Sequence, residues 1–166
     1  MLLSDRRFVL RGLALWGLGL AACGFTPAYG PTGQGSRLQD SILADAPANR
    51  DDFLLIQQFL SRLGRGSEGP YALGYSYSIS GASMAITAEN VTARVNLVGR
   101  VSFVLRDRVT DAVLLRGSVD GFTGYSTTGS TTATEAASRD ARARLAVLLA
   151  DQMVIRLTAA AGNLPA

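Results

Sequence analysis

The chain has 166 residues, a formal net charge of +3 and 48% hydrophobic residues, which suits one domain with one apolar core. Its 16 basic residues are all arginine, because the chain contains neither lysine nor histidine. The missing histidine excludes Ser-His-Asp and Cys-His nucleophiles and histidine-ligated metal sites. The missing lysine excludes Schiff-base chemistry and the phosphate-binding lysine of a P-loop.

The N-terminus has the three parts of a secretory signal. Residues 6–11 supply a basic start, residues 12–20 ("GLALWGLGL") form a short apolar core, and two alanines follow. A transmembrane helix needs about 20 apolar residues, and here the apolar run fails by Pro27. We therefore predict that residues 1–22 are a signal peptide. The segment "RRFVLR" also resembles a twin-arginine export signal, and ordinary Sec export remains equally open.

The only cysteine of the chain follows this signal directly. The sequence Leu20-Ala21-Ala22-Cys23 resembles the lipobox of bacterial lipoproteins, where a diacylglycerol is attached to the thiol before cleavage. That chemistry needs a thiolate nucleophile. The resemblance implies cleavage between Ala22 and Cys23, and a mature protein held on a membrane by acyl chains such as palmitate. Gly24, where enterobacterial proteins retained at the inner membrane have aspartate, implies sorting to the outer membrane.

A tether, a strand and a helix are expected next. Residues 23–36 ("CGFTPAYGPTGQGS") are rich in glycine and proline, which predicts a flexible, lipidated tether. The domain itself is expected to span residues 37–161, with a first short strand within residues 38–44. Asn49 is placed to cap a helix that runs to Leu63 and stops at Gly64. The expected apolar stripe of this helix comprises Phe53, Ile56, Leu60 and Leu63.

Alternating patterns predict an antiparallel sheet after a loop at residues 64–70. One strand is expected over residues 71–79, followed by an irregular stretch up to Asn90. Residues 93–106 alternate again, residues 107–111 ("DRVTD") turn the chain, and residues 113–125 return as the partner strand. The glycines of the returning strand are expected to mark bulges or close approach of other elements. They are Gly117, Gly121 and Gly124.

A second helix closes the chain. The pattern from Thr132 to Glu135 is typical of a capping box, and the helix is expected to reach Ala160. Its expected stripe comprises Ala137, Ala141, Leu145, Leu148 and Ile155, and residues 162–166 are expected to be a frayed tail. Both helices must bury apolar stripes, and the sheet offers one apolar face. We therefore predict an α+β fold: a two-layer sandwich with two helices packed on one face of a mostly antiparallel three- to four-stranded sheet.

The chemical groups of the mature chain point to binding rather than catalysis. Cleavage leaves 144 residues with 13 arginines and 12 acids, so the net charge of about +1 does not indicate a nucleic-acid partner. Residues 124–131 ("GYSTTGST") have P-loop spacing, but Ser130 stands where lysine is required. No metal and no cofactor are expected. Paired carboxylates alone can hydrolyse glycosides, so a carboxylate-dependent hydrolase stays open. Its candidate acids are Asp51, Asp52, Asp107, Asp111 and Asp120.

Two segments and the order of elements resemble a known family. The segment "CGFTPAYG" directly after the lipobox and residues 124–149 ("GYSTTGSTTATEAASRDARARLAVLL") are similar to LptE-type lipopolysaccharide-assembly lipoproteins, in their alphaproteobacterial form. The matching positions of the second segment are Tyr125, Ala133, Ala137, Asp140 and Ala141. The family's serine, asparagine and aromatic residue are replaced by Gly124, Ser126 and Thr132.

The resemblance implies a non-enzymatic role. Family members lie inside a large outer-membrane β-barrel, LptD, as a plug. They help the barrel to assemble and to insert lipopolysaccharide into the outer leaflet. The implied partners are an LptD-like barrel, lipopolysaccharide and, through the N-terminal lipid, the outer membrane, with the domain facing the periplasm or inside the barrel lumen. Two alternatives remain: an auxiliary lipoprotein of a lipid-transport ABC system, and a lipid-anchored periplasmic hydrolase.

The alternation of residues 93–106 also predicts a row of arginines on the polar face of the sheet. Arg94, Arg100 and Arg106 share that face, and Arg116 belongs to the even-numbered set of the next strand. An ordinary solvated sheet face is one explanation. The functional hypothesis is that these guanidinium groups contact the phosphates of lipopolysaccharide or the barrel wall, because arginine binds phosphate bidentately.

Overall fold

The computed structural model describes residues 33–86 and 92–165, so Ala22, Cys23 and the predicted signal peptide lie outside the described residues. Within these ranges the order of elements is the predicted one: strand, helix, three strands, helix. The elements are η1 (Gln34–Leu38), β1 (Ile42–Ala44), α2 (Arg50–Leu63), β2 (Tyr71–Ile86), β3 (Thr92–Asp107), β4 (Val113–Ser126), α3 (Thr131–Ala160) and η2 (Ala161–Asn163).

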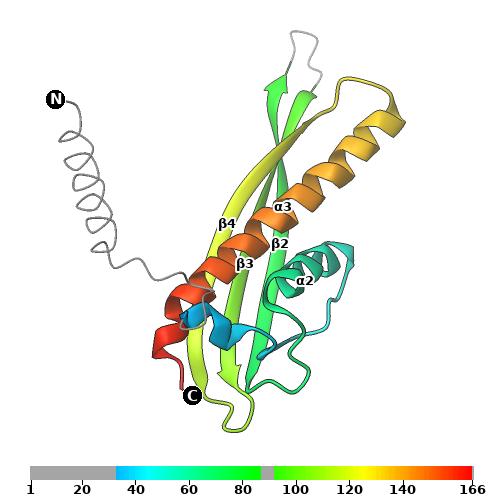
Figure 1. Ribbon diagram of the computed structural model, residues 1–166. Coiled ribbons are helices and arrows are strands. Elements are labelled where there is room, and N and C mark those ends of the chain that lie inside the picture. Colours follow the sequence, from blue (N-terminus) through cyan, green and yellow to red (C-terminus); the bar gives the residue numbers. More distant parts are fainter. Residues whose placement is uncertain (1–32, 87–91, 166) are drawn as a thin grey trace, which may run out of the picture.

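The four strands form one mixed sheet in the order β1-β2-β3-β4. Strand β1 is the short first strand that was predicted, and it runs parallel to β2. The other two pairs are antiparallel. Both helices cover the same face of this sheet, with α3 lying diagonally across β3 and β4 (Figure 1). The α+β sandwich is therefore confirmed, with four strands.

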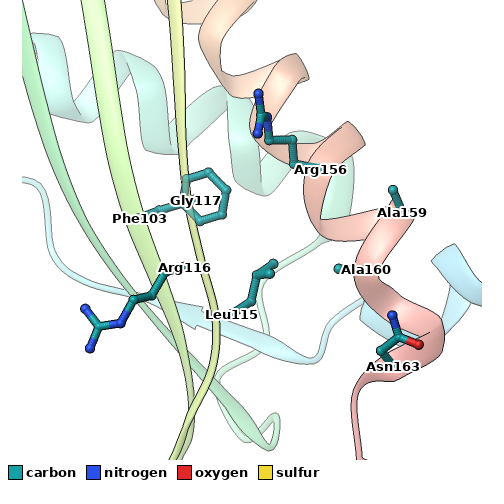
Figure 2. A pocket seen from close by; sticks show the side chains of 8 residues that line it. All are labelled: Phe103, Leu115, Arg116, Gly117, Arg156, Ala159, Ala160 and Asn163. Carbon is teal, nitrogen blue, oxygen red and sulfur yellow. The ribbon is translucent and has the colours of Figure 1, made fainter.

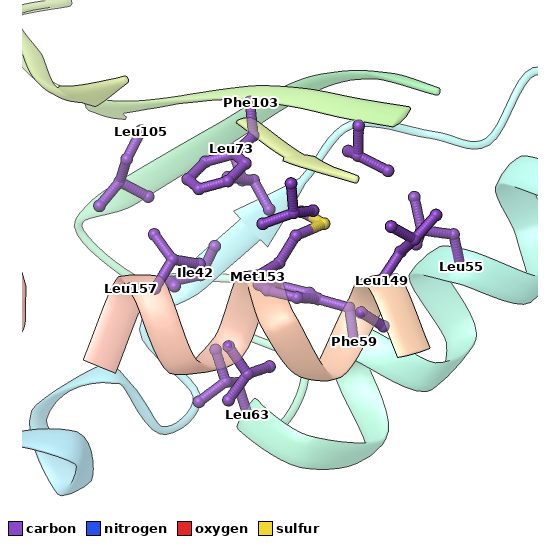
Figure 3. Close-up of a cluster of buried hydrophobic side chains, with 14 of the residues drawn as sticks. Ile42, Leu55, Phe59, Leu63, Leu73, Phe103, Leu105, Leu149, Met153 and Leu157 are labelled. Atoms are coloured by element: carbon purple, nitrogen blue, oxygen red, sulfur yellow. The ribbon is translucent and has the colours of Figure 1, made fainter. Parts of the chain in front are cut away.

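The core lies between the sheet and the two helices (Figure 3). Strand β3 contributes alternate residues, because successive side chains of a strand point to opposite faces. Leu97, Val101, Phe103 and Leu105 are all buried, as the alternation predicted. From the helices, the fully buried side chains include Leu55 and Phe59 of α2, and Leu149, Met153 and Leu157 of α3.

The predicted helix stripes are partly wrong. Phe53 of α2 is 53% exposed and Ile155 of α3 is 66% exposed, whereas the spacing had placed both in the core. Helix α3 packs against the sheet and also against α2, so its buried arc is wide, and apolar residues surround most of its circumference. Periodicity alone therefore does not identify the buried arc. By length and composition Thr131–Asn163 is apolar enough to cross a membrane, but eight residues of α3 are buried within this domain.

The ends of helix α2 follow the prediction and the start of α3 does not. The side chain of Asn49 accepts a hydrogen bond from the Asp52 amide, and Gly64 ends α2 with a φ of 80°, a conformation that favours glycine. In α3 the cap is Ser130, whose hydroxyl accepts from the Ala133 amide at 3.2 Å. The capping box predicted at Thr132 lies inside the first turn instead.

Three segments are more ordered than expected. Residues 80–86, predicted to be irregular, continue β2, because β3 extends equally far and pairs with them. The first residues of η1 fall within the predicted tether, yet Gly35 is buried. The expected frayed tail is packed: Leu164 is buried, and the Tyr71 hydroxyl donates a hydrogen bond to the Pro165 carbonyl at 2.6 Å.

The glycines of β4 mark close approach, one of the two roles predicted for them. A side chain at Gly121 would collide with Leu148 of α3, and one at Gly124 would lie 2.7 Å from the Asn96 amide oxygen. The register shift between β3 and β4 occurs elsewhere, after Leu105. The small residues of the strand therefore let α3 lie close to the sheet.

Candidate functional site

The candidate site is the open face, which we define as the sheet face that carries no helix. The even-numbered side chains of β2, β3 and β4 form it, because the odd-numbered ones point into the core. Strand β2 contributes only small residues over six positions: Ala72, Gly74, Ser76, Ser78, Ser80 and Ala82. The long side chains come from the other two strands. These are Arg94, Asn96, Val98, Arg100, Val104 and Arg106 of β3, and Arg116, Asp120 and Phe122 of β4.

Three of the four predicted arginines form no ion pair among the described residues. Arg94 extends over Gly124, since its guanidinium lies 3.1 Å from the position that a Gly124 Cβ would take. Arg100 lies directly across from Asp120 in the β3–β4 register, and Arg116 lies across from Val104. Within the part of the chain that the structure describes, neither Arg100 nor Arg116 has a carboxylate within ion-pair distance. All three guanidinium groups are exposed to solvent.

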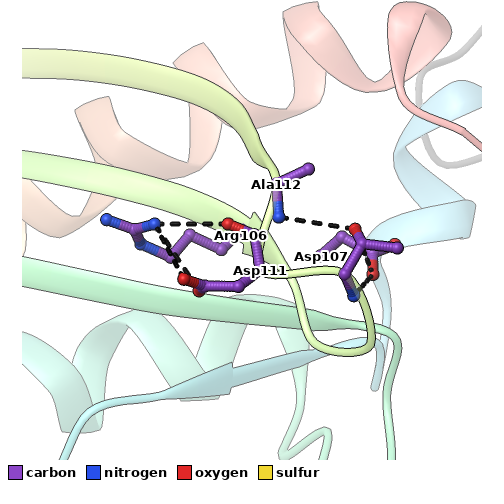
Figure 4. A network of polar contacts seen from close by, with 5 residues as sticks. Arg106, Asp107, Asp111 and Ala112 are labelled. Carbon is purple, nitrogen blue, oxygen red and sulfur yellow. Dashed lines mark hydrogen bonds and ion pairs between the residues drawn. The ribbon is translucent and has the colours of Figure 1, made fainter.

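The fourth arginine is part of a turn. The Arg106 guanidinium lies 3.5 Å from the Asp111 carboxylate and donates to the Asp111 carbonyl at 3.3 Å (Figure 4). Asp111 has a φ of 55°, so this contact holds the last residue of the β3–β4 turn. Arg106 is thus already occupied, unlike the other three arginines of the row.

The candidate acid Asp107 serves the same turn. Its Oδ1 accepts hydrogen bonds from the amides of Thr110 at 2.8 Å and Val109 at 2.9 Å, and from the Thr110 hydroxyl at 3.0 Å. These bonds, led by the one from the Thr110 amide, hold the pKa of Asp107 below its usual value. A carboxylate that is satisfied in this way is a structural group rather than a poised catalytic acid.

The remaining candidate acids also have structural partners. Asp51 of α2 forms a 2.6 Å ion pair with Arg142 of α3. The buried Asp52 carboxylate accepts from the Ala48 amide at 3.2 Å and from the Asn49 side chain at 3.0 Å. Over residues 33–86 and 92–165, no three potential ligands gather in a way that could hold a metal ion. The acids therefore do not converge on one site.

Two tyrosines on the helix-covered face have buried hydroxyl oxygens. Neither Tyr75 nor Tyr77 has a hydrogen-bond partner for its hydroxyl in the described part of the chain. Burial raises the pKa of each to about 12, and the nearby carboxylates of Asp52 and Asp51 contribute in the same direction. Both hydroxyls consequently stay protonated at physiological pH.

One feature that the sequence patterns did not reveal is a hollow of about 400 Å³ between β4 and the C-terminal end of α3 (Figure 2). It is lined by Phe103, Leu115, Arg116, Gly117, Arg156, Ala159, Ala160 and Asn163. The hollow exists because small residues face one another: Gly117 on the strand, and two alanines on the helix. That combination is the signal in the sequence that could have indicated it.

Comparison with protein families identifies the chain's relatives. The family model described as "LptE: Lipopolysaccharide-assembly" matches residues 38–157. This range begins in η1 and ends in the last turns of α3, so it includes the open face and every strand of the sheet. None of the curated protein sequences matches this chain.

Solved structures share the fold. A protein of Caulobacter crescentus described as a lipoprotein is 27% identical, with a TM-score of 0.65, over 80% of this chain and 98% of its own. Rare lipoprotein B of Shewanella oneidensis is 11% identical, with a TM-score of 0.56, over 74% of this chain and 96% of its own. A minor lipoprotein of Acinetobacter baumannii is 21% identical, with a TM-score of 0.54, over 75% and 94%.

Proposed function

Because the chain belongs to the LptE family of lipopolysaccharide-assembly proteins, we propose that it is a non-enzymatic outer-membrane lipoprotein that plugs an LptD-like β-barrel. In this role it supports assembly of the barrel and helps to insert lipopolysaccharide into the outer leaflet. The observation that carries the proposal is the family match over residues 38–157. The structural partners of the candidate acids, described above, also favour binding over hydrolysis.

The anchor is the first part of the proposal. Cys23 carries the acyl chains, and cleavage occurs between Ala22 and Cys23. The lipobox resemblance supports this assignment, as does the position of the cysteine at the end of an apolar run. Several acyl chains hold a protein firmly on a membrane, since each buried CH₂ contributes about 0.8 kcal/mol. The domain then needs no transmembrane segment of its own.

The open face is the second part. Arg94, Arg100 and Arg116 contact phosphates of lipopolysaccharide or the inner wall of the barrel. Their exposure supports this, and so does the lack of ion-pair partners for them among the described residues. A guanidinium that is not already paired is available for bidentate contact with an anion. Arg106 contributes less, because Asp111 occupies it.

Co-purification tests the partner. The full mature protein is extracted from native membranes in mild detergent, and the proteins that accompany it are identified by mass spectrometry. A large outer-membrane β-barrel in stoichiometric amount is the expected result. Recovery of an ABC transporter complex would support the auxiliary-lipoprotein alternative, and recovery of the protein alone would contradict the plug proposal.

Charge substitution tests the open face. The triple variant Arg94→Gln, Arg100→Gln and Arg116→Gln should bind less lipopolysaccharide or recover less barrel than the wild type. The matched control replaces Arg50, Arg65 and Arg139 by Gln. These three are exposed, lie off the open face and change the net charge equally. Circular dichroism checks folding. If both variants bind alike, the open face is only a solvated surface.

A further inference from the structure

The hollow between β4 and α3 has an apolar floor and a polar rim. Phe103 and Leu115 supply the floor, and the missing side chain of Gly117 keeps it open. Arg156 and Asn163 of the helical side add a guanidinium and an amide. In Figure 2 the Arg116 side chain leads away from the helix, so the hollow has one cationic group at its rim. Such a site suits a planar apolar group with a polar tip.

The start of the described chain lies beside this hollow. The first turn, η1, packs against both α3 and η2, and Asn163 of η2 lines the hollow. Residues 23–32 ("CGFTPAYGPT") precede Gly33 directly and carry two aromatic rings. At about 3.3 Å per extended residue, Tyr29 is within roughly 13 Å of Gly33. The ring of Tyr29 is therefore within reach of a site at this end of α3.

We propose that residues 24–32 dock against the domain, with the Tyr29 ring in the hollow between β4 and α3. There the ring contacts Phe103, and aromatic pairs of this kind are favourable by about 0.5–1.5 kcal/mol beyond burial. The Arg156 guanidinium stacks on its face, and the Asn163 amide accepts the hydroxyl proton. Because the ring is tethered, its effective concentration is about millimolar, so modest contacts suffice. This inference does not depend on the proposed barrel partner.

Docking would fix the point where the lipid anchor leaves the domain. Cys23 is six residues from Tyr29, a distance of at most about 20 Å in an extended chain. A docked Tyr29 holds the anchored end of the chain close to the C-terminal end of α3. The membrane then meets the domain at that end, and the long axis of the sheet gains a defined orientation to the lipid surface.

Limited proteolysis tests the proposal on the mature protein in detergent. Chymotrypsin cleaves after Tyr29 only when that residue is undocked, and mass spectrometry of the N-terminus reports the cut. The variant Ala159→Trp fills the hollow from an exposed position and should speed this cleavage by about tenfold, the equivalent of about 1.4 kcal/mol. The control Ala136→Trp adds the same ring to an exposed position near the start of α3 and should leave the rate unchanged. Equal rates in wild type and Ala159→Trp would overturn the proposal.

A photo-crosslink gives a second readout that does not need the filled hollow. Benzoylphenylalanine at position 29 should crosslink to Leu115, Ala159 or Asn163, whereas the same group at the exposed turn residue Val109 should not. The variant Cys23→Ala separates the tether from its lipid. Protection and crosslinking that persist without the acyl chains support docking of the tether itself. Their loss would mean that an acyl chain occupies the hollow, and the assignment of Tyr29 would be wrong.

Discussion

The ring of Phe103 occupies the space of the side chain that Gly117 lacks. The two residues are direct partners in the β3–β4 register, and a Cβ built on Gly117 would lie 2.5 Å from Phe103 Cζ. Phe103 is 1% exposed, so its ring has little room to move. The covered glycine joins the edge strand to the core through one aromatic side chain.

Adding a methyl group at this position should destabilise the domain. We expect Gly117→Ala to lower the free energy of unfolding by about 1–3 kcal/mol, because overpacking forces a buried ring out of its preferred rotamer. Urea denaturation measures the change. Gly81→Ala is the matched control, since its Cβ would meet only side chains at 3.7 Å, and it should be neutral or raise stability by up to about 1 kcal/mol. Similar losses for both variants would show that strand glycine, not Phe103, is the cause.

The Asp107 turn should make stability depend on acid. Hydrogen bonds from the Thr110 and Val109 amides lower the pKa of Asp107 in the folded state. A lowered pKa contributes stability above the unfolded value of 3.8, and this contribution is lost as pH falls through the folded pKa. The denaturation midpoints of wild type and Asp107→Ala should differ at pH 7 and converge below about pH 3. A constant difference across this range would contradict the assignment.

Two tyrosine hydroxyls should be dispensable for stability. Tyr75→Phe and Tyr77→Phe each remove a buried hydroxyl that has no partner among the described residues. We therefore expect the free energy of unfolding at pH 7 to stay equal or rise by up to about 2 kcal/mol. The control Tyr71→Phe removes a 2.6 Å hydrogen bond to the Pro165 carbonyl and should lose about 0.5–1.5 kcal/mol. A clear loss in either of the first two variants would reveal a partner for that hydroxyl.

The same two tyrosines should govern unfolding in base. Burial raises the pKa of Tyr75 and Tyr77 from 10.0 to about 12. A raised pKa contributes stability that is complete below the unfolded value and is lost as pH rises through the folded value. Wild-type stability should therefore fall between about pH 10 and 12. The double phenylalanine variant should show a shallower fall over the same range in denaturation experiments.

The sheet could be predicted from the sequence because its two faces differ in chemistry at every second residue. Along β3, buried Leu97, Val101 and Phe103 alternate with Arg100 and Ser102, and this contrast determines both the strand and its orientation. Such alternation has one interpretation. The cap at Asn49 was equally readable, since its side chain acts on its own helix.

The helix faces and the hollow could not be predicted in this way, because they depend on contacts between distant segments. Ile155 and Met153 are both apolar, but only the packing of α3 on α2 and the sheet decides that Met153 is buried. The hollow needs Gly117 and Ala159 to face each other across 42 residues of chain. Arg106 looked equivalent to Arg100 in the pattern, and only the turn conformation of Asp111 distinguishes them.

Cellular function should survive loss of the candidate acids. Asp107 is satisfied within its turn, and Asp120 lies on the open face across from Arg100. We expect Asp107→Asn and Asp120→Asn to support growth and outer-membrane integrity as the wild type does, at equal protein abundance. If either folded variant abolished function, a carboxylate-dependent hydrolase would become the better proposal.

The anchor should depend on one atom, the Cys23 sulfur. The variant Cys23→Ala has no thiol at all, because the chain contains a single cysteine, so it offers no acceptor for diacylglycerol. The variant protein should lack acyl chains and should be soluble in the periplasm or remain uncleaved. Mass spectrometry of the N-terminus from the native host measures both outcomes, and Ala21→Ser is a control that keeps the thiol and a small residue before it. An unmodified Cys23 in the wild-type protein would refute the lipid anchor, and with it the proposed attachment to the outer membrane.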